Sequence, residues 1–577
     1  MDNVLSTPEF FYLINLRGTL ETSSLGGKDR SVIGGKAAGL LAARDMIADF
    51  DRVHFKDIKI DIPSMAVLTT DVFDAFMQRN RLDELDFSSL ADRRIAHAFQ
   101  NADMPFEVLG SLRSLMETVT DPLALRSSGM LEDITERPFS GVYKTKMIPN
   151  NQLNADVRFQ KLVEAVKYVW ASTYFKISRD YCKAIGKNIT EEKMAVILQR
   201  VAGKRHKERF YPELSGVARS YNFYPLRPAK AADGVVDLAL GLGKTVVDGD
   251  KTWTYSPEYP NKPPPFESVQ EMLEQTQTVF WAINLGEPDE YDPLSEVEYM
   301  QKKDLLDAEE DKVLRYLAST YDPQSERVSM GINQDGPRLL TFAPLLSLNE
   351  LPFNRLVTAL LQRCEKVLGV PVEIEFAMTF DPHHFAFLQV RPMLLPNGDF
   401  KVTREELRSE NLLAASENVL GNGWVEDIQD VVYVLPQKFE KGQTRQIASE
   451  LEQMNDSLMS LGRPYLLIVF GRLGTFDPWL GIPVAWGQIG AARVIIEATQ
   501  DNVKVELSQG SHYFHNIINL GIKYFSMPFS KPYQIDWDWL DRQEELSRTD
   551  NVRHVHLPSP LKIKVDGLNS RGVILKN

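Results

Sequence analysis

The segment from residue 371 to residue 391 constrains the fold more than any other part of the chain. Its first half, PVEIEFAMTF, alternates apolar and acidic residues, and its second half, HFAFLQVR, follows the turn-forming DPH. Side chains on a β-strand point alternately to its two faces, so each half predicts a strand. Together they predict a β-hairpin with one apolar face and one polar face.

The polar face of this hairpin carries Glu373 and Glu375 on one strand and Gln389 and Arg391 on the other. Carboxylate and amide oxygens suit Mg²⁺, and an arginine beside them suits polyphosphate. If Glu375 pairs with Gln389 across the two strands, then Glu373 pairs with Arg391. This register requires a connection of three or five residues between the strands. A connection of four residues would instead place Gln389 beside Phe376. A solvated face with cross-strand salt bridges is the commoner explanation of such a pattern.

A glycine pair followed by a lysine, Gly34-Gly35-Lys36, falls between a predicted short strand and a predicted helix within residues 31–50. Glycines allow the backbone close to a ligand, and a helix N-terminus with a lysine favours phosphate. A tight turn with a surface lysine fits the same residues. The run GLGKT at 241–245 is not a P-loop, because Leu238 stands where that motif requires its first glycine.

A second short motif, Arg126-Ser127-Ser128, combines a fork of donors with two hydroxyls and suits phosphate oxygens, although a surface arginine with a capping serine would look alike. Apolar spacing predicts a long helix over 155–186 and strands over 194–202 and 214–224. The polar run KRHKER between those strands predicts a solvated hairpin loop. After Pro392 the composition changes, which places the main domain boundary near residue 395.

Composition excludes several classes of protein. The net charge of −14 argues against nucleic acid and anionic membranes as partners. The start of the sequence lacks the pattern of a signal peptide, and no apolar run has the length of a membrane span, so we expect a cytoplasmic location. Cys182 and Cys364 lie far apart outside any CxxC pattern, which argues against a disulfide framework or a zinc site.

Several motifs taken together resemble the nucleotide-binding domain of the phosphoenolpyruvate synthase and pyruvate phosphate dikinase family. The resemblance covers about residues 30–393, and the motifs occur in the family's order. They are IGGKAAGL, LRSSGMLED, FSGVYKT, VWASTYFKISRDY, MAVILQRV, LSGVARS, GLGKTVVDG, EIEFAM and FLQVRP.

The resemblance implies an α+β (mixed α/β) ATP-grasp domain over residues 1–395 that binds ATP and Mg²⁺. It implies that Lys36 and Arg126 hold ATP phosphates, that Glu375 and Gln389 help to bind Mg²⁺, and that Arg391 contacts phosphate and stabilises charge during transfer. Glu373 stands where the family usually has aspartate. The remaining residues that the resemblance places at the nucleotide are Gly34, Gly35, Ser127 and Ser128.

A second resemblance lies in residues 510–522, GSHYFHNIINLGI, which are similar to the phosphohistidine motif of the family's swivelling domain. It implies a smaller, divergent swivel-like α/β domain with a C-terminal tail over residues 396–577. His512 aligns with the phosphorylated histidine, while Tyr513 and Phe514 stand where small residues are usual. A structural or solvent-exposed histidine fits the same residues.

These features favour an ATP-dependent, Mg²⁺-dependent phosphotransferase that passes phosphate to His512 or to a bound acceptor. The part beyond Pro392 is shorter than the family's pyruvate-binding barrel, so we expect pyruvate, if it is the acceptor, to be bound by a separate domain or subunit. A catalytically silent ATP-sensing or scaffold module is the main alternative. A dikinase acting on a glucan or an antibiotic is a third.

Overall fold

The computed structural model describes most of the chain, and all structural statements below concern these residues. They are 9–21, 30–48, 50, 54–130, 141–184, 187–223, 225, 228–248, 250–264, 266, 268–288, 290–348, 350–393, 401–475, 481–500, 517, 521–529 and 533–577.

The first sheet has six strands in the order β2-β1-β4-β7-β5-β6. Helices cover it and bury an aromatic cluster in which Phe76 lies against both Phe99 and Trp170. The strands are β1 (Phe11–Asn15), β2 (Gly18–Glu21), β4 (Met65–Leu68), β5 (Leu123–Gly129), β6 (Thr145–Ile148) and β7 (Met194–Arg200), and the helices are α2 (Thr70–Arg79), α3 (Asp92–Asn101), α4 (Phe106–Thr118), α5 (Ala155–Ser172) and α6 (Lys176–Ala184).

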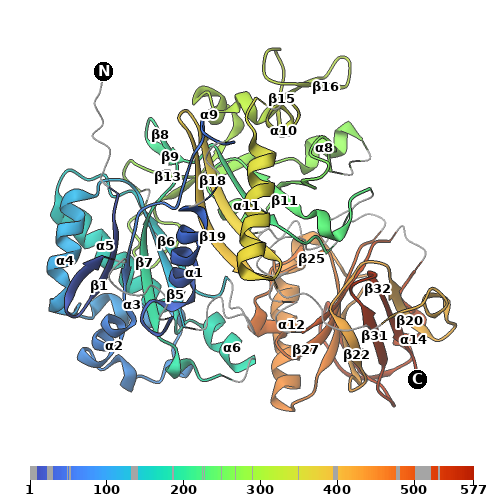
Figure 1. Ribbon diagram of the computed structural model, residues 1–577. Coiled ribbons are helices and arrows are strands. Elements are labelled where there is room, and N and C mark those ends of the chain that lie inside the picture. Colours follow the sequence, from blue (N-terminus) through green and yellow to red (C-terminus); the bar gives the residue numbers. More distant parts are fainter. Residues whose placement is uncertain are drawn as a thin grey trace.

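The second sheet has the order β12-β11-β10-β18-β19-β3, and the predicted hairpin forms its β18 and β19. Helix α11 (Phe353–Leu368) covers this sheet (Figure 1), because Leu356, Leu360 and Cys364 recur at helical spacing and are buried. The strands are β3 (Lys59–Asp61), β10 (Leu214–Arg219), β11 (Val235–Ala239), β12 (Trp253–Tyr255), β18 (Val372–Phe380) and β19 (His383–Pro392).

Helix α1 (Arg30–Ala48) contacts both sheets, through β5 of the first and β19 of the second. The short strand predicted before the glycine pair is wrong, since helical structure begins at Arg30 and is interrupted by a break at Gly34. The break occurs because Gly34 adopts a φ of 72°, which a helix does not accommodate. Lys36 therefore stands in the first turn after the break.

Two other local predictions are corrected. The long helix predicted over 155–186 is divided into α5 and α6 by a tight turn, in which the amides of Thr173, Tyr174 and Phe175 donate to carbonyls three residues back. Within this turn Tyr174 stacks on Phe87 with ring centroids 4.0 Å apart. The strands predicted at 194–202 and 214–224 are β7 and β10, which lie in different sheets. The residues between them form their own hairpin, β8 (Lys204–His206) and β9 (Arg209–Tyr211).

Smaller elements extend the second half of this region. One sheet has the order β14-β13-β9-β8, and another has the order β16-β15-β17. Their remaining strands are β13 (Val279–Asn284), β14 (Met300–Asp304), β15 (Ala318–Asp322), β16 (Arg327–Met330) and β17 (Arg338–Leu340), and the accompanying helices are α7 (Lys244–Val247), α8 (Val269–Gln275), α9 (Leu305–Glu310) and α10 (Ala343–Ser347).

The C-terminal unit, residues 401–577, is built on a seven-stranded sheet of order β21-β28-β27-β24-β23-β30-β29. Its four central strands run parallel, and helix α12 (Thr444–Ser460) connects β23 to β24. The strands are β21 (Val419–Leu420), β23 (Asp430–Val434), β24 (Tyr465–Phe470), β27 (Ala492–Ala498), β28 (Lys523–Met527), β29 (Glu544–Arg548) and β30 (Val552–His556).

A four-stranded sheet of order β20-β32-β31-β22 completes this unit (Figure 1). The end of the chain, expected to be a C-terminal tail without an assigned role from residue 530 to residue 577, supplies β29 to β32 of the two sheets. The elements are β20 (Leu412–Ser416), β22 (Asn422–Val425), β31 (Lys562–Asp566), β32 (Arg571–Leu575), the short pair β25 (Arg472–Leu473) and β26 (Gly481–Ile482), and helix α14 (Trp537–Asp541).

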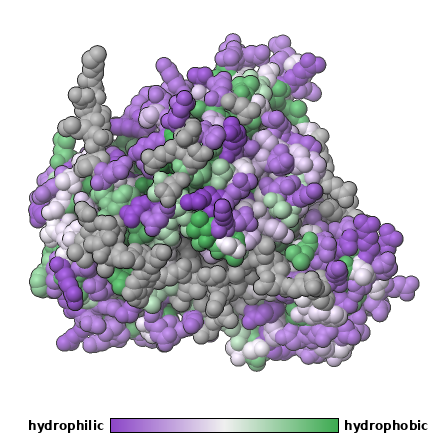
Figure 2. Space-filling model, in the orientation of Figure 1, coloured by the Kyte–Doolittle hydropathy of each residue, from purple (hydrophilic) through white to green (hydrophobic). Residues whose placement is uncertain are grey.

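The face of the molecule in Figure 2 is mainly hydrophilic. Among the described residues no helix combines the length and the hydropathy that crossing a membrane requires.

Candidate nucleotide site

The hairpin of β18 and β19 has the register that the site requires. Glu375 lies opposite Gln389 and Glu373 lies opposite Arg391. The predicted loop length is wrong, since only Asp381 and Pro382 separate the strands. A β-bulge beyond Glu375 supplies the missing residue, because Phe376 pairs with Phe387 and Leu388 is the extra residue.

The polar face of the hairpin points into the protein. Glu373 is 1% exposed, and Gln389 and Arg391 are each 5% exposed. A solvated face with surface salt bridges is therefore not what the sheet presents. Charges buried to this degree need partners or a ligand.

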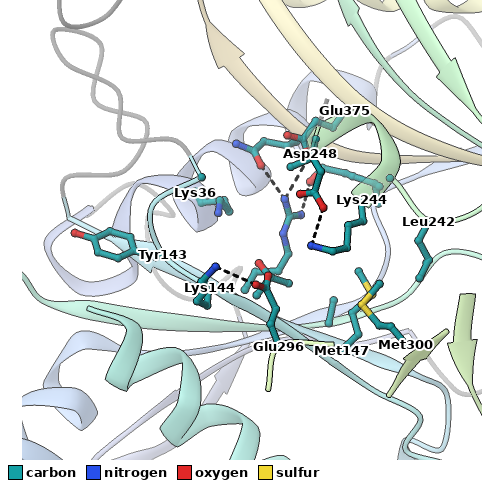
Figure 3. Close-up of a pocket in the computed structure, with 18 of the residues that line it drawn as sticks. Lys36, Tyr143, Lys144, Met147, Leu242, Lys244, Asp248, Glu296, Met300 and Glu375 are labelled. Atoms are coloured by element: carbon teal, nitrogen blue, oxygen red, sulfur yellow. Dashed lines mark hydrogen bonds and ion pairs between the residues drawn. The ribbon is translucent and has the colours of Figure 1, made fainter. Parts of the chain in front are cut away.

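A pocket of about 450 Å³ opens beside this face (Figure 3). It brings together residues that the sequence placed at an ATP site from four separate elements: Lys36 of α1, Arg126 of β5, Glu375 of β18, and Gln389 and Arg391 of β19. The first sheet and the hairpin of the second sheet thus contribute charged groups to one cavity.

Arg126 connects the two sides of the pocket. Its guanidinium donates to Gln389 Oε1 at 2.7 Å and to the Leu388 carbonyl at 2.8 Å, and it lies 3.5 Å from Glu375 Oε2. The amide oxygen of Gln389 and the carboxylate of Glu375 therefore converge on a single cationic group. This convergence shows that the paired positions on β18 and β19 present oxygen atoms to a common point.

Glu373 stands behind the pocket and does not line it. Its carboxylate accepts hydrogen bonds from Nε of Arg219 and from Nε of Arg391, each at 2.6 Å. Arg219 also donates to Asp237 at 2.6 Å. Burial lowers the pKa of Arg219, but the carboxylates of Glu373 and Asp237 more than offset this and leave the pKa above its ordinary value.

Arg219 is a residue that the sequence reasoning missed. The signal was available, because an arginine in the small and apolar run LSGVARS needs a buried acidic partner if the run is an interior strand. Through Glu373, Arg219 fixes the guanidinium of Arg391 at the edge of the pocket.

The glycine pair and the serine pair meet behind Lys36 and do not line the pocket. Ser128 Oγ donates to the Ile33 carbonyl at 2.7 Å and accepts from the Ala37 amide at 3.0 Å. Ser127 is fully buried on the neighbouring position of β5. These contacts join α1 to β5 on either side of the break at Gly34, and so position Lys36 relative to Arg126.

Replacing Gly34 by alanine is expected to disturb this junction. An added Cβ would lie 1.8 Å from the Ser128 carbonyl oxygen, and the φ of 72° disfavours any L side chain. Strain and overpacking of this kind each cost on the order of 1–3 kcal/mol, so thermal unfolding should begin at a clearly lower temperature. Gly39→Ala in the same helix is the control, because its Cβ would meet nothing closer than 3.4 Å. Equal melting of both variants would contradict the prediction.

Two ion pairs on the pocket wall were not predicted from the sequence. Lys144 lies 3.1 Å from Glu296, and Lys244 of the GLGKT run lies 2.9 Å from Asp248 (Figure 3). Burial lowers the pKa of Lys244, but the carboxylates of Asp248 and Glu296 more than offset it and raise the pKa. Beside these pairs, Met147, Leu242 and Met300 form an apolar part of the lining.

His512 lies outside the described residues, as do the other residues from 510 to 516 of the 510–522 motif. The serine of the FSG loop, Ser140, also lies outside them, whereas Gly141 lines the pocket. Among the described residues no group of three or more acidic, histidine or cysteine side chains forms a metal cluster.

The pocket is bordered by two mixed sheets. The side of the first sheet supplies cationic groups, and the hairpin of the second supplies a carboxylate, an amide and an arginine. This arrangement defines an α+β nucleotide-binding protein of the ATP-grasp type. The chain belongs to the pyruvate phosphate dikinase family, since the family model for its AMP/ATP-binding domain matches residues 30–411, more than half of the sequence. A search of curated proteins found no match.

Proposed function

We propose that this protein is a Mg²⁺-dependent phosphotransferase that takes a phosphoryl group from ATP and passes it to His512 or to a bound acceptor. The observation that carries the proposal is the convergence of Lys36, Arg126, Glu375, Gln389 and Arg391 on one pocket. ATP binding follows from the family. The transfer step rests on the chemistry of these five side chains, which suits a polyphosphate with a bound metal ion.

The donor set of the hairpin fits Mg²⁺. Glu375 and Gln389 occupy paired positions, and their oxygens already converge on the guanidinium of Arg126. Mg²⁺ is usually held by one or two carboxylates together with substrate phosphates, so a set of this size is sufficient. When bound, the ion would neutralise charge on the phosphate oxygens.

In the proposed step a neutral imidazole nitrogen of His512 attacks a phosphorus atom of ATP. The N–P bond forms, the P–O bond to the departing nucleotide breaks with its electron pair going to the leaving oxygen, and the other ring nitrogen releases its proton to solvent. Lys36 and Arg126 hold the phosphates in place. Arg391, fixed by Glu373, donates to the oxygens on which negative charge develops.

Intact mass and acid-labile phosphate analysis after incubation with Mg²⁺ and ATP would test this proposal. The wild type is expected to gain one phosphoryl group that is lost in acid and is absent from His512→Ala. His515→Ala, three residues along the same motif, is the matched control and should keep the label.

If the phosphoryl label persists in His512→Ala, another group of the protein is the phosphate acceptor. The absence of any label, with ATP binding retained, would overturn the His512 step. It would leave direct transfer to a small acceptor, or an ATP-sensing module without turnover.

A further inference from the structure

Residues 293–300, here called the strap, lie between β13 and β14 and run alongside β6 of the first sheet. Two ion pairs join the strap to this strand. Lys144, just before β6, lies 3.1 Å from Glu296, and Lys146 lies 2.6 Å from Glu298. Lys146 Nζ also donates to the Pro293 carbonyl at 2.8 Å. The strap is therefore bound to the first sheet at three of its residues.

The two ion pairs lie in different environments. Lys144 and Glu296 are partly exposed and line the nucleotide pocket. The side chains of Lys146 and Glu298 are each 1% exposed, and neither residue lines the pocket. One pair thus faces the space that a ligand would fill, and the other pair is enclosed behind it.

The position of Lys146 on β6 explains this burial. Its neighbours Thr145 and Met147 line the pocket, so Lys146 points to the opposite face of the strand. There its Nζ lies 5.2 Å from the ring centre of Tyr168 and 5.8 Å from that of Tyr299. Burial lowers the pKa of Lys146, although nearby carboxylates oppose the shift. Since a buried ion pair adds little stability that an apolar pair would not supply, its main effect here is to fix the strap in one place.

The strap contributes Glu296 and Met300 to the pocket lining. Met300 lies with Met147 and Leu242 on the side of the pocket away from Lys36 (Figure 3). An aromatic base has apolar faces, and methionine makes favourable contacts with aromatic rings. A ribose beside the base offers hydroxyl donors, which a carboxylate accepts. The strap side of the pocket therefore suits the nucleoside part of a nucleotide, and the Lys36 side suits its phosphates.

We propose that Lys146 is a positioning residue for the nucleoside end of ATP. Through Glu298 and the Pro293 carbonyl it fixes the strap against β6, and so sets Glu296 at the ribose and Met300 at the base. This role rests on the proposed function, because it requires ATP to lie in the pocket with its phosphates at the cationic groups. Those groups belong to α1, β5 and β19, so the strap acts on the nucleoside and not on the phosphates.

The double variant Lys146→Met with Glu298→Leu is the first test. It removes both buried charges together, and such an exchange for apolar residues is often neutral for stability, so the midpoint of urea unfolding should be unchanged. The KM for ATP is expected to rise at least fivefold, while kcat stays within twofold. Glu298→Gln, which keeps an acceptor for Lys146, is the milder second variant and should raise KM less.

A binding measurement separates the nucleoside from the phosphates. Displacement of mant-ATP, a fluorescent ATP analogue, by AMPPNP or by tripolyphosphate, each with Mg²⁺, gives the affinity for either competitor. The double variant should bind AMPPNP at least fivefold more weakly, and should bind tripolyphosphate, which has no nucleoside, within twofold of the wild type. Lys564→Met with Glu406→Leu is the matched control, because this pair is also 2.6 Å apart and does not line the pocket. It should leave both affinities unchanged.

Glu296→Ala tests whether Lys146 acts through the strap. The change should weaken AMPPNP binding in the wild type but add little to the loss in the double variant, where the strap no longer holds Glu296 at the ribose. Groups that act through one another show non-additive losses of this kind. Fully additive losses would overturn the role of Lys146.

The remaining outcomes distinguish this role from the proposed function. If the wild type binds AMPPNP but does not turn over ATP, the phosphotransfer falls, and the AMPPNP affinities still decide the role of Lys146. If the wild type binds no nucleotide, the nucleotide site and the role of Lys146 fall together. Unchanged AMPPNP affinity in the double variant would overturn the role of Lys146 alone. An equal loss of affinity for AMPPNP and tripolyphosphate would also overturn it, since Lys146 would then support the structure as a whole.

Discussion

Arg391→Ala is expected to slow Mg²⁺-dependent phosphoryl transfer from ATP by about 10³-fold, the lower end of what an arginine at the transferred phosphate provides. The side chain lines the pocket, and its Nε donates to Glu373 at 2.6 Å, which holds the guanidinium fork in one orientation. A fixed donor stabilises the charge that develops during transfer without having to reorganise. The loss should therefore fall on the turnover rate more than on mant-ATP affinity. Consumption of ATP and the nucleotide formed would be followed by chromatography.

Two variants control this experiment. Arg391→Lys keeps the charge but loses the planar fork, so it should recover only part of the rate. Arg338→Ala removes an arginine that binds Glu309 through two nitrogens, at 2.9 and 2.6 Å, and that does not line the pocket. It should leave the rate unchanged. A rate in Arg391→Ala within twofold of the wild type would remove Arg391 from the proposed mechanism.

The hairpin that carries Arg391 could be predicted from the sequence because its information is local. Alternation sets which side chains share a face, and the acidic, amide and arginine residues fall on one face whatever the rest of the chain does. From the sequence, the pairing of Glu375 with Gln389 was conditional on a connection of three or five residues, whereas the protein achieves it with a two-residue turn and a bulge at Leu388. A bulge adds a residue without a composition signal, so the loop length could not be inferred.

The parts of the site that depend on distant contacts were not predictable in the same way. That Gly34 packs against Ser128 depends on how α1 meets β5. That residues 483–488 form a wall of the pocket depends on how two regions of the chain pack together. Neither the periodicity of apolar residues nor the residue types encode such placements directly. For the same reason the helix predicted over 155–186 was too long. Its apolar spacing continues through Tyr174, which lies in the tight turn between α5 and α6 and stacks on the distant Phe87.

Glu373→Ala is expected to be the most destabilising single change at the site. The carboxylate is 1% exposed and is shared by Arg219 and Arg391, so its removal leaves Arg391 without the carboxylate that orients it. Removing one partner from a buried charge network typically costs about 3–5 kcal/mol, a large part of the stability of a protein. Urea unfolding followed by tryptophan fluorescence should show the loss as a lower midpoint at an unchanged slope.

The size of that loss distinguishes a charge network from ordinary packing at this position. Glu373→Asp keeps the charge with a shorter arm and should cost less than alanine, because one arginine can still be bound closely. Glu310→Gln is the matched surface control: its carboxylate is 63% exposed beside Lys207, and its loss should stay within about 0.5 kcal/mol. If Glu373→Ala lowered the free energy of unfolding no more than Glu310→Gln does, the placement of Arg219 and Arg391 would not depend on Glu373. The orientation of Arg391 in the pocket would then need another cause, and the proposed role of Arg391 in transfer would lose its structural basis.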